Sequence, residues 1–232
     1  MIAEISLVGL AIAFIPALIV IAIMVYWRSI AATALYASAR MLVQLLLIGY
    51  VLVYIFESDN WLVIFAVLAV MLFASSWIAT RTLESRTTPL FLQAMGSIAV
   101  GGFLTLALVT QFVLRVEPWF SPRYVVPLAG MILSSSMNAV SLAGERFQAE
   151  RARDVNYPDA RRTALQAALI PNINSLFAVG LVALPGMMTG QILSGVSPLI
   201  AAQYQIMVMT MIFGSSGISA SCYLALQRRA AV

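Results

Sequence analysis

The chain has 232 residues, of which 62% are hydrophobic and only 9% are charged, and its formal net charge is +4. A soluble domain is about 25% charged, so this sequence lacks the polar side chains that would cover a water-soluble globule. The composition therefore predicts an all-α, polytopic membrane protein and excludes a soluble enzyme. The positive charge comes from arginines spread among the loops, which is typical of membrane topology and does not indicate nucleic-acid binding.

Seven membrane spans are expected in chain order, because a spanning helix needs about 20 apolar residues. They cover residues 5–27, 40–56, 61–80, 93–114, 124–143, 169–184 and 202–226. The small residues at 31–39 are expected to lie along the membrane interface before the second span. Pro185 and Gly186 are expected to interrupt the sixth span, with an amphipathic turn after them. Residues 1–232 are expected to form one transmembrane domain.

The arginines predict the orientation of these spans. Eleven of the thirteen fall in the first, third and fifth loops and at the C-terminus, and only Arg115 and Arg123 fall on the opposite side. Because positive residues collect in cytoplasmic loops, the N-terminus is expected outside and the C-terminus in the cytoplasm.

Several chemistries are excluded by residues that the sequence lacks. There is no Lys and no His, and Cys222 is the only cysteine. Without Lys the chain has no P-loop lysine for ATP, and without His it has no zinc site of the common spacings, so no cofactor is expected in this chain. All nine carboxylates are expected in loops or at span edges, which argues against proton-driven transport.

Polar side chains in two spans are candidates for a transport pathway. In the fifth span, Asn138 is the deepest polar group on a face that repeats every three or four residues, together with Gly130, Ser134, Ser141 and Glu145. This face either packs against another helix or lines a water-filled pathway. Near the start of the sixth span, Asn172 and Asn174 either form structural hydrogen bonds or ligate a hydrated cation.

The interrupted segment from Leu184 to Gln191 is a candidate gate or dimer contact. A helix break inside the membrane frees backbone N–H and C=O groups, which must then bond to protein or face a cavity. Met187 and Met188 lie within it. Thioethers are soft metal ligands, but methionine is also a flexible apolar filler, and both interpretations stay open. The metal ligands themselves are not identified.

Residues Gly144 to Gln166 are expected to form one long polar cytoplasmic loop, in which Pro158 begins a new helix. Its mixed charges are typical either of a solvent-exposed surface or of a surface that binds a cytosolic partner.

Two stretches resemble a known family. The run ALIPNINSLFAVGLVALPGMMTGQILSGVSPLIAAQYQIMVM from Ala168 is similar to the signature of the FetB permeases, and SARMLVQLLLIGYVL from Ser38 resembles that family's second-span motif. Members are membrane subunits of bacterial iron-exporting ABC transporters, with plant relatives linked to aluminium tolerance. With the helix count, the resemblance extends over nearly the whole chain.

The resemblance implies a homodimeric permease of the bacterial inner membrane that exports metal ions, with iron expected, and is driven by a separate FetA-like ATPase that binds ATP and Mg. It implies that the loop supplies the contact with this ATPase, through Glu145, Arg146, Glu150, Arg151, Arg153, Arg161 and Arg162. Gln44 lies in the matched second-span motif and is assigned to the pathway with Asn138, Asn172, Asn174, Met187, Met188 and Gln191. Alternatives are export of a metal chelate, a small organic or a lipid-like molecule, or a non-transporting membrane scaffold.

Overall fold

A computed structural model describes residues 6–58, 60–83 and 87–230. The regular elements of these residues are helices, apart from an isolated bridge between Val179 and Ala183. The expected all-α class is confirmed. The start of the first expected span, and the carboxylates Glu4, Asp59 and Glu84, lie outside the described residues. The helices fall into two compact units, which meet in the sequence between Glu57 and Ser58.

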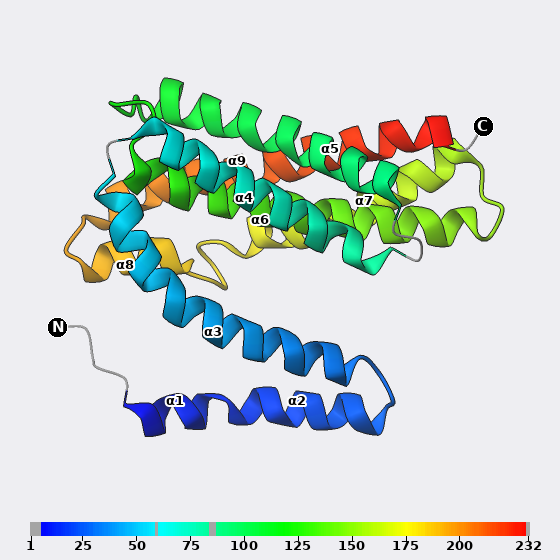
Figure 1. Cartoon of the computed structure of the whole chain (residues 1–232), viewed down its shortest axis with the longest axis horizontal. Coiled ribbons are helices and arrows are strands. Elements are labelled where there is room, and N and C mark those ends of the chain that lie inside the picture. Colours follow the sequence, from blue (N-terminus) through cyan, green and yellow to red (C-terminus); the bar gives the residue numbers. More distant parts are fainter. Residues whose placement is uncertain (1–5, 59, 84–86, 231–232) are drawn as a thin grey trace. The chain divides into compact units, whose positions relative to one another are not determined.

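The first unit is a helical hairpin of α1 (Leu7–Ala13), α2 (Ile15–Tyr26) and α3 (Ala31–Phe56), drawn in blue in Figure 1. Phe14 separates α1 from α2, just before Pro16, and α2 and α3 run antiparallel. None of the side chains of α2 is buried, as expected of a helix that faces lipid or a partner. Residues 31–39 are continuous with the second span, so the separate interfacial segment predicted there is not formed.

The second unit is a bundle around two long helices. Its helices are α4 (Trp61–Ala79), α5 (Thr88–Ala107), α6 (Pro122–Arg151), α7 (Tyr157–Ala178), α8 (Gly186–Leu193) and α9 (Pro198–Leu226). A 3₁₀ turn follows α4 at Thr80–Thr82, a π-helical turn follows α5 at Leu108–Val113, and a second 3₁₀ turn follows α9 at Gln227–Ala230. Helices α6 and α9 pack along each other at the centre, with α5 and α7 against both and α4 against α5 and α6 (Figure 1).

Small residues bring α5, α6 and α9 into close contact. A Cβ atom at Gly101 of α5 would overlap the Ser219 hydroxyl and lie 2.8 Å from the carbonyl oxygen of Ser215. The Ser135 and Ser216 hydroxyls form a hydrogen bond of 2.7 Å between α6 and α9. In a membrane, where water supplies no hydrophobic drive between helices, such close packing and hydrogen bonding are the main sources of association.

Six helical segments of the described residues are long and apolar enough to cross a membrane: Val8–Tyr26, Ala31–Phe56, Trp61–Thr82, Thr88–Val113, Pro122–Arg151 and Pro198–Leu226. The sixth expected span is not among them, because its helix ends at Ala178. The apolar part of α7, about 11 residues from Ala168, rises only about 16 Å, against about 30 Å of bilayer core. The expected count of seven spans and the orientation of the termini stay predictions.

The predicted break in the sixth span is present, but it begins at Val179 and not at Pro185. Gly180 has φ +83°, the left-handed conformation that ends helices and that glycine adopts at no steric cost. Pro185 instead caps the start of α8.

The segment Gly144–Gln166, predicted as a loop, is mostly helical. α6 continues to Arg151, so only residues 152–156 lie outside a helix. α7 begins at Tyr157 with Pro158 in its first turn, which confirms the helix start predicted there. Glu145 and Glu150 are therefore helical residues and do not lie in a loop. Their polar character suggested a loop. A helix, however, satisfies its own backbone hydrogen bonds, so it can continue from lipid into water with polar side chains on its surface.

Candidate functional site

The turn between α6 and α7 forms a compact charged corner, residues 145–162, which we call the coupling corner after the role predicted for it. Asp154 adopts a positive φ of 60° within the turn. The guanidinium of Arg151 donates to the carbonyl oxygen of Val155 at 2.8 Å, and Arg146 Nη2 lies 2.6 Å from Glu150 Oε1. Asn156 caps α7 by accepting a hydrogen bond of 3.0 Å from the Asp159 amide. The turn is thus held by side chains at both of its ends.

The coupling corner is also anchored to α9. The Tyr157 hydroxyl donates to the carbonyl oxygen of Leu224 at 2.9 Å, and the Tyr157 ring packs edge-on against Phe147, 5.9 Å between centroids. Alanines of α6, α7 and α9 fill the space beside them, namely Ala139, Ala143, Ala160, Ala164, Ala168 and Ala220. The corner is therefore attached to α6, α7 and α9.

The seven residues predicted to contact an ATPase are divided by the structure into two groups. Glu150 is only 8% exposed and Arg151 is half-buried, and both are used within the corner. The exposed group is Glu145, Arg146, Arg153, Arg161 and Arg162. The Arg161 guanidinium lies over the Tyr157 ring, 5.5 Å from its centroid. The side chains available to a partner are therefore mainly arginines.

The predicted pathway residues lie on several helices. Asn138 is exposed midway along α6, and its neighbour on the same face, Ser141, bonds Thr82 at 2.9 Å. On α7, Asn174 is exposed and Asn172 is half-buried; Gln44 is exposed on α3, in the first unit. Within the second unit, this face thus packs against the turn after α4 at Ser141 and is exposed at Asn138, so both predictions for it stay open.

The remaining three pathway residues, Met187, Met188 and Gln191, lie on α8 and are half-buried. Met188 lines a cavity of about 300 Å³ that lies between the end of α7, α8 and α9. We call it the hairpin cavity; it belongs to the second unit and not to the hairpin of α1–α3. Its other lining residues are Leu176, Val179, Gly180, Ala202, Gln205, Ile206, Met209 and Thr210. The hairpin cavity therefore forms where the sixth span is broken.

The hairpin cavity contains a functional candidate that the sequence did not single out. Gln205 is only 5% exposed, and its amide Oε1 has no hydrogen-bond partner; the Oε1 of Gln191 is buried without a partner as well. A glutamine near the start of an apolar span is itself a signal, because buried polar groups in a membrane are costly and commonly functional.

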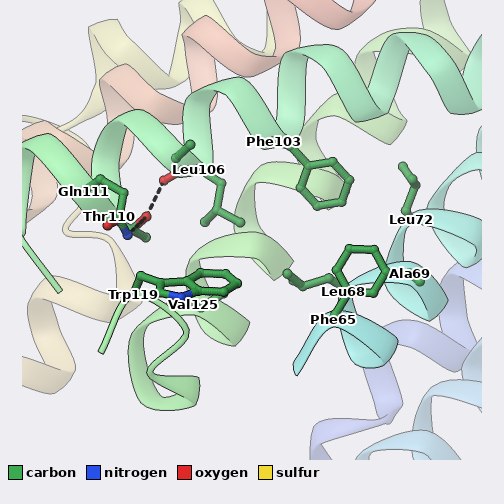
Figure 2. Close-up of a pocket in the computed structure, with 11 residues that line it drawn as sticks. Phe65, Leu68, Ala69, Leu72, Phe103, Leu106, Thr110, Gln111, Trp119 and Val125 are labelled. Carbon is green, nitrogen blue, oxygen red and sulfur yellow. Dashed lines mark hydrogen bonds between the residues drawn. The ribbon is translucent and has the colours of Figure 1, made fainter. Parts of the chain in front are cut away.

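A second and larger cavity, of about 550 Å³, lies between α4, α5 and the start of α6 (Figure 2). It is lined by Phe65, Leu68, Ala69, Leu72, Phe103, Leu106, Ala107, Thr110, Gln111, Trp119 and Val125. The Gln111 amide donates to the Thr110 hydroxyl at 3.2 Å, and that hydroxyl donates to the Leu106 carbonyl at 2.9 Å. These polar groups thus have partners, and the cavity presents an apolar, aromatic surface.

The usual metal-binding side chains do not converge anywhere in the described residues. Within them, no group of three or more His, Cys, Asp or Glu lies close enough to hold a metal ion. A metal that passes through this part of the chain would meet amides, hydroxyls and thioethers.

Comparison with known proteins gives a consistent assignment. The model of the uncharacterised protein family UPF0014 matches residues 7–157 and 151–232. A UPF0014 membrane protein of Synechocystis is 35% identical over 83% of this chain and 81% of the relative. The probable iron export permease protein FetB of Escherichia coli is 32% identical over 89% and 86%, and the protein ALUMINUM SENSITIVE 3 of Arabidopsis thaliana is 32% identical over 84% and 77%. No solved structure matches the chain.

Proposed function

Because the chain belongs to the UPF0014 family of membrane proteins, we propose that it is the permease subunit of an ATP-driven exporter of metal ions, with iron as its expected substrate. The observation that carries the proposal is the similarity, over most of both chains, to a relative named as a probable iron export permease. The subunit acts in the bacterial inner membrane as a homodimer.

ATP is hydrolysed by a second chain. This sequence contains no lysine and therefore no P-loop lysine, so ATP and Mg are bound by a partner ATPase of the FetA type. The partner docks on the coupling corner. The exposed Arg153, Arg161 and Arg162 attract an acidic surface, while Tyr157 and Arg151 keep the corner rigid. A rigid corner is required, because a flexible one would lose the movement produced by ATP hydrolysis.

The coupling corner leads directly to the interrupted segment. Helix α7 runs from Tyr157 at the corner to Ala178 at the edge of the hairpin cavity. A displacement of the corner is therefore transmitted along one helix of 22 residues to the gate formed by α8. Met187, Met188 and Gln191 belong to that gate, and Asn172 and Asn174 line the approach to it.

An exposed amide in the middle of a membrane helix supports the pathway and the homodimer. Asn138 lies near the centre of α6, which has 30 residues, and its side chain is exposed in the second unit. Facing lipid there is unfavourable, because hydrocarbon offers no hydrogen-bond partner. A second copy, or a water-filled pathway between two copies, would satisfy it. Gln44, in the first unit, stays a predicted pathway residue.

A second candidate substrate class is an apolar or lipid-like molecule. The 550 Å³ cavity of Figure 2 favours it, because its size and its aromatic lining suit an acyl chain or a small apolar compound. Transport of such a molecule would use the same ATPase and the same coupling corner.

The test is co-purification of the chain with its ATPase, followed by ATP hydrolysis in the presence of Fe²⁺. We expect a stable complex whose hydrolysis rises with Fe²⁺. Arg153→Glu combined with Arg162→Glu should reduce the recovered ATPase about tenfold, since two surface attractions become repulsions. Arg123→Glu, on the predicted opposite side, is the matched control and should leave recovery unchanged. Absence of any associated ATPase would favour a membrane scaffold and contradict the proposal.

A further inference from the structure

We propose that Arg40 binds a carboxylate-bearing anion in the middle of the membrane, and that the metal ion is exported together with this anion. The inference rests on the proposed function and deepens it, because it states in what chemical form the metal travels. It follows from the depth of Arg40, from the donors beside it and from the metal ligands that the described residues lack.

The first argument is the depth of Arg40. The sequence pattern indicates the start of a span at Arg40, but α3 begins nine residues earlier, at Ala31. Only residues 27–30 join α3 to the antiparallel α2 (Figure 1). Arg40 and Ala17 therefore lie about level, because each is nine residues from the end of its helix nearest the turn. Ala17 is the midpoint of Val8–Tyr26, whose 19 residues just cover a bilayer core of about 30 Å. Arg40 thus lies near the middle of the membrane.

This depth is too great for the Arg40 side chain to reach the membrane surface. Nine residues of helix rise about 14 Å, whereas an extended arginine side chain spans roughly 6 Å from its Cα atom. The guanidinium therefore stays about 8 Å inside the hydrocarbon core even when it points back toward the turn. A charged group at such a depth is costly without a partner, and it commonly marks the pathway of a substrate or ion.

The described residues offer Arg40 no carboxylate at mid-membrane. In the first unit the only described carboxylate is that of Glu57, which follows the other end of α3, 17 residues or about 25 Å away. The described carboxylates of the second unit lie in turns or near helix ends, at Glu117, Glu145, Glu150, Asp154 and Asp159. Among them Glu145, in the last two turns of α6, lies nearest the middle of its helix. A bound anion supplies the partner that these residues do not.

The side chains beside Arg40 favour an oxyanion. Tyr36 and Gln44 lie one turn before it and one turn after it, within an arc of about 80° on α3. All three side chains are exposed in the first unit, and none has a hydrogen-bond or ion-pair partner among the described residues of that unit. A guanidinium binds a carboxylate through two parallel N–H···O bonds, and the Gln44 amide and the Tyr36 hydroxyl add donors on either side.

The bound anion also supplies ligands for the metal ion. Among the described residues, no group of three or more His, Cys, Asp or Glu converges on one point. An anion with several carboxylates can bind Arg40 through one of them and ligate the metal ion through the others. A dication alone would instead be repelled by the positive charge of Arg40, and this repulsion is strong where the dielectric constant is low. The anion removes it.

The anion is a small soluble molecule and not the headgroup of an anionic lipid. Headgroups lie at the membrane surface, about 14 Å along α3 from Arg40, which the side chain cannot span. A soluble anion that enters with the metal ion reaches this depth through the pathway.

The test is equilibrium binding of radioactive citrate, a tricarboxylate that ligates iron, to the permease–ATPase complex in nanodiscs of phosphatidylcholine. Arg40→Gln removes the charge and the paired donors, and should weaken citrate binding at least tenfold. Arg40→Lys keeps the charge without the planar fork and should bind with an affinity between the two. Arg28→Gln makes the same change in the turn of the first unit and is the matched control, expected to bind like the parent.

Three results would overturn the anion site. The first is absence of citrate binding by the parent, or parent-like binding by Arg40→Gln. The second is binding that appears only after Glu145→Gln, because that carboxylate would then be the partner of Arg40. The third is loss of citrate binding when phosphatidylglycerol is added to the nanodiscs, which would assign Arg40 to a lipid headgroup.

ATP hydrolysis by the same complex separates the anion site from the proposed function. If citrate binds with the expected variant pattern but Fe²⁺ with citrate does not stimulate hydrolysis, the anion site stands and the proposed function fails. If Fe²⁺ stimulates hydrolysis equally with and without citrate, and Arg40→Gln behaves like the parent, the proposed function stands and the anion site fails.

Discussion

The contact between α5, α6 and α9 and the segment that joins α7 to α8 are built in opposite ways. In the first, small residues bring backbones together, so that even a single Cβ atom at Gly101 has no room. In the second, the helix is broken, a cavity of about 300 Å³ remains, and buried amide oxygens lack partners. Both regions leave buried polar atoms without a partner, the Ser136 and Ser219 hydroxyls in the first and the amide oxygens of Gln191 and Gln205 in the second, but the second also has a cavity.

We therefore distinguish two parts of one bundle: a fixed part, the contact between α5, α6 and α9, and a responsive part, the segment that joins α7 to α8. Close packing resists deformation, because interiors packed to this density have low compressibility. An interrupted helix with a cavity has fewer contacts to lose when it moves. The coupling corner connects the two parts, since Tyr157 bonds α9 while α7 continues to the cavity.

The largest expected effect is at the fixed part. Gly101→Ala should destabilise the protein by about 3 kcal/mol, because the added methyl group overlaps backbone and side-chain atoms of α9 that can move little. The matched control is Gly96→Ala on the same helix, where no atom lies within 4 Å. It should be neutral or stabilising by up to about 1 kcal/mol. Unfolding in mixed detergent measures both, and equal stabilities would show that the contact is not tight.

A smaller effect is expected at the coupling corner. Tyr157→Phe removes the hydrogen bond to the Leu224 carbonyl and should lower the unfolding free energy by about 1.5 kcal/mol. It should also lower the yield of transport per ATP, because the corner is less firmly attached to α9. Tyr124→Phe, at an exposed tyrosine of α6, is the control. Unchanged coupling in a destabilised Tyr157→Phe variant would restrict this residue to a structural role.

The smallest effect on stability is expected at the break. Gly180→Ala forces an alanine into a left-handed conformation, at a cost of about 1 kcal/mol. Its effect on substrate binding should be larger than its effect on unfolding, because Gly180 forms part of the wall of the hairpin cavity. Gly190→Ala, on α8 with open space around it, should leave binding unchanged and be neutral or stabilising by up to about 1 kcal/mol. If Gly180→Ala lowers stability strongly and leaves binding unchanged, the break is structural.

Much of the fold was predictable from hydropathy, because each spanning helix must satisfy its own backbone in lipid. The expected spans at 61–80 and 202–226 correspond to α4 and α9, and the all-α class is confirmed. The break in the sixth span was also predicted. Its position was not, because the conformation of Gly180 depends on how α7 ends, which hydropathy does not record.

The candidate site was less predictable. Met188 was identified as a pathway residue and lies on the wall of the hairpin cavity, but Gln205 was not identified. An amide within an apolar run looks the same in sequence whether it is paired or unpaired, and only packing distinguishes the two. The polar stretch from Gly144 to Gln166 predicted a loop because its residues are charged, although charged residues also form exposed helices.

The most direct test of ATP-driven metal export is uptake of Fe²⁺ into sealed proteoliposomes that contain the permease and its ATPase, with the ATPase facing outward. The account predicts Fe²⁺ accumulation that requires ATP hydrolysis and is lost with a catalytically inactive ATPase. Uptake that proceeds without ATP, or ATP-dependent movement of a lipid-like probe with none of Fe²⁺, would contradict it.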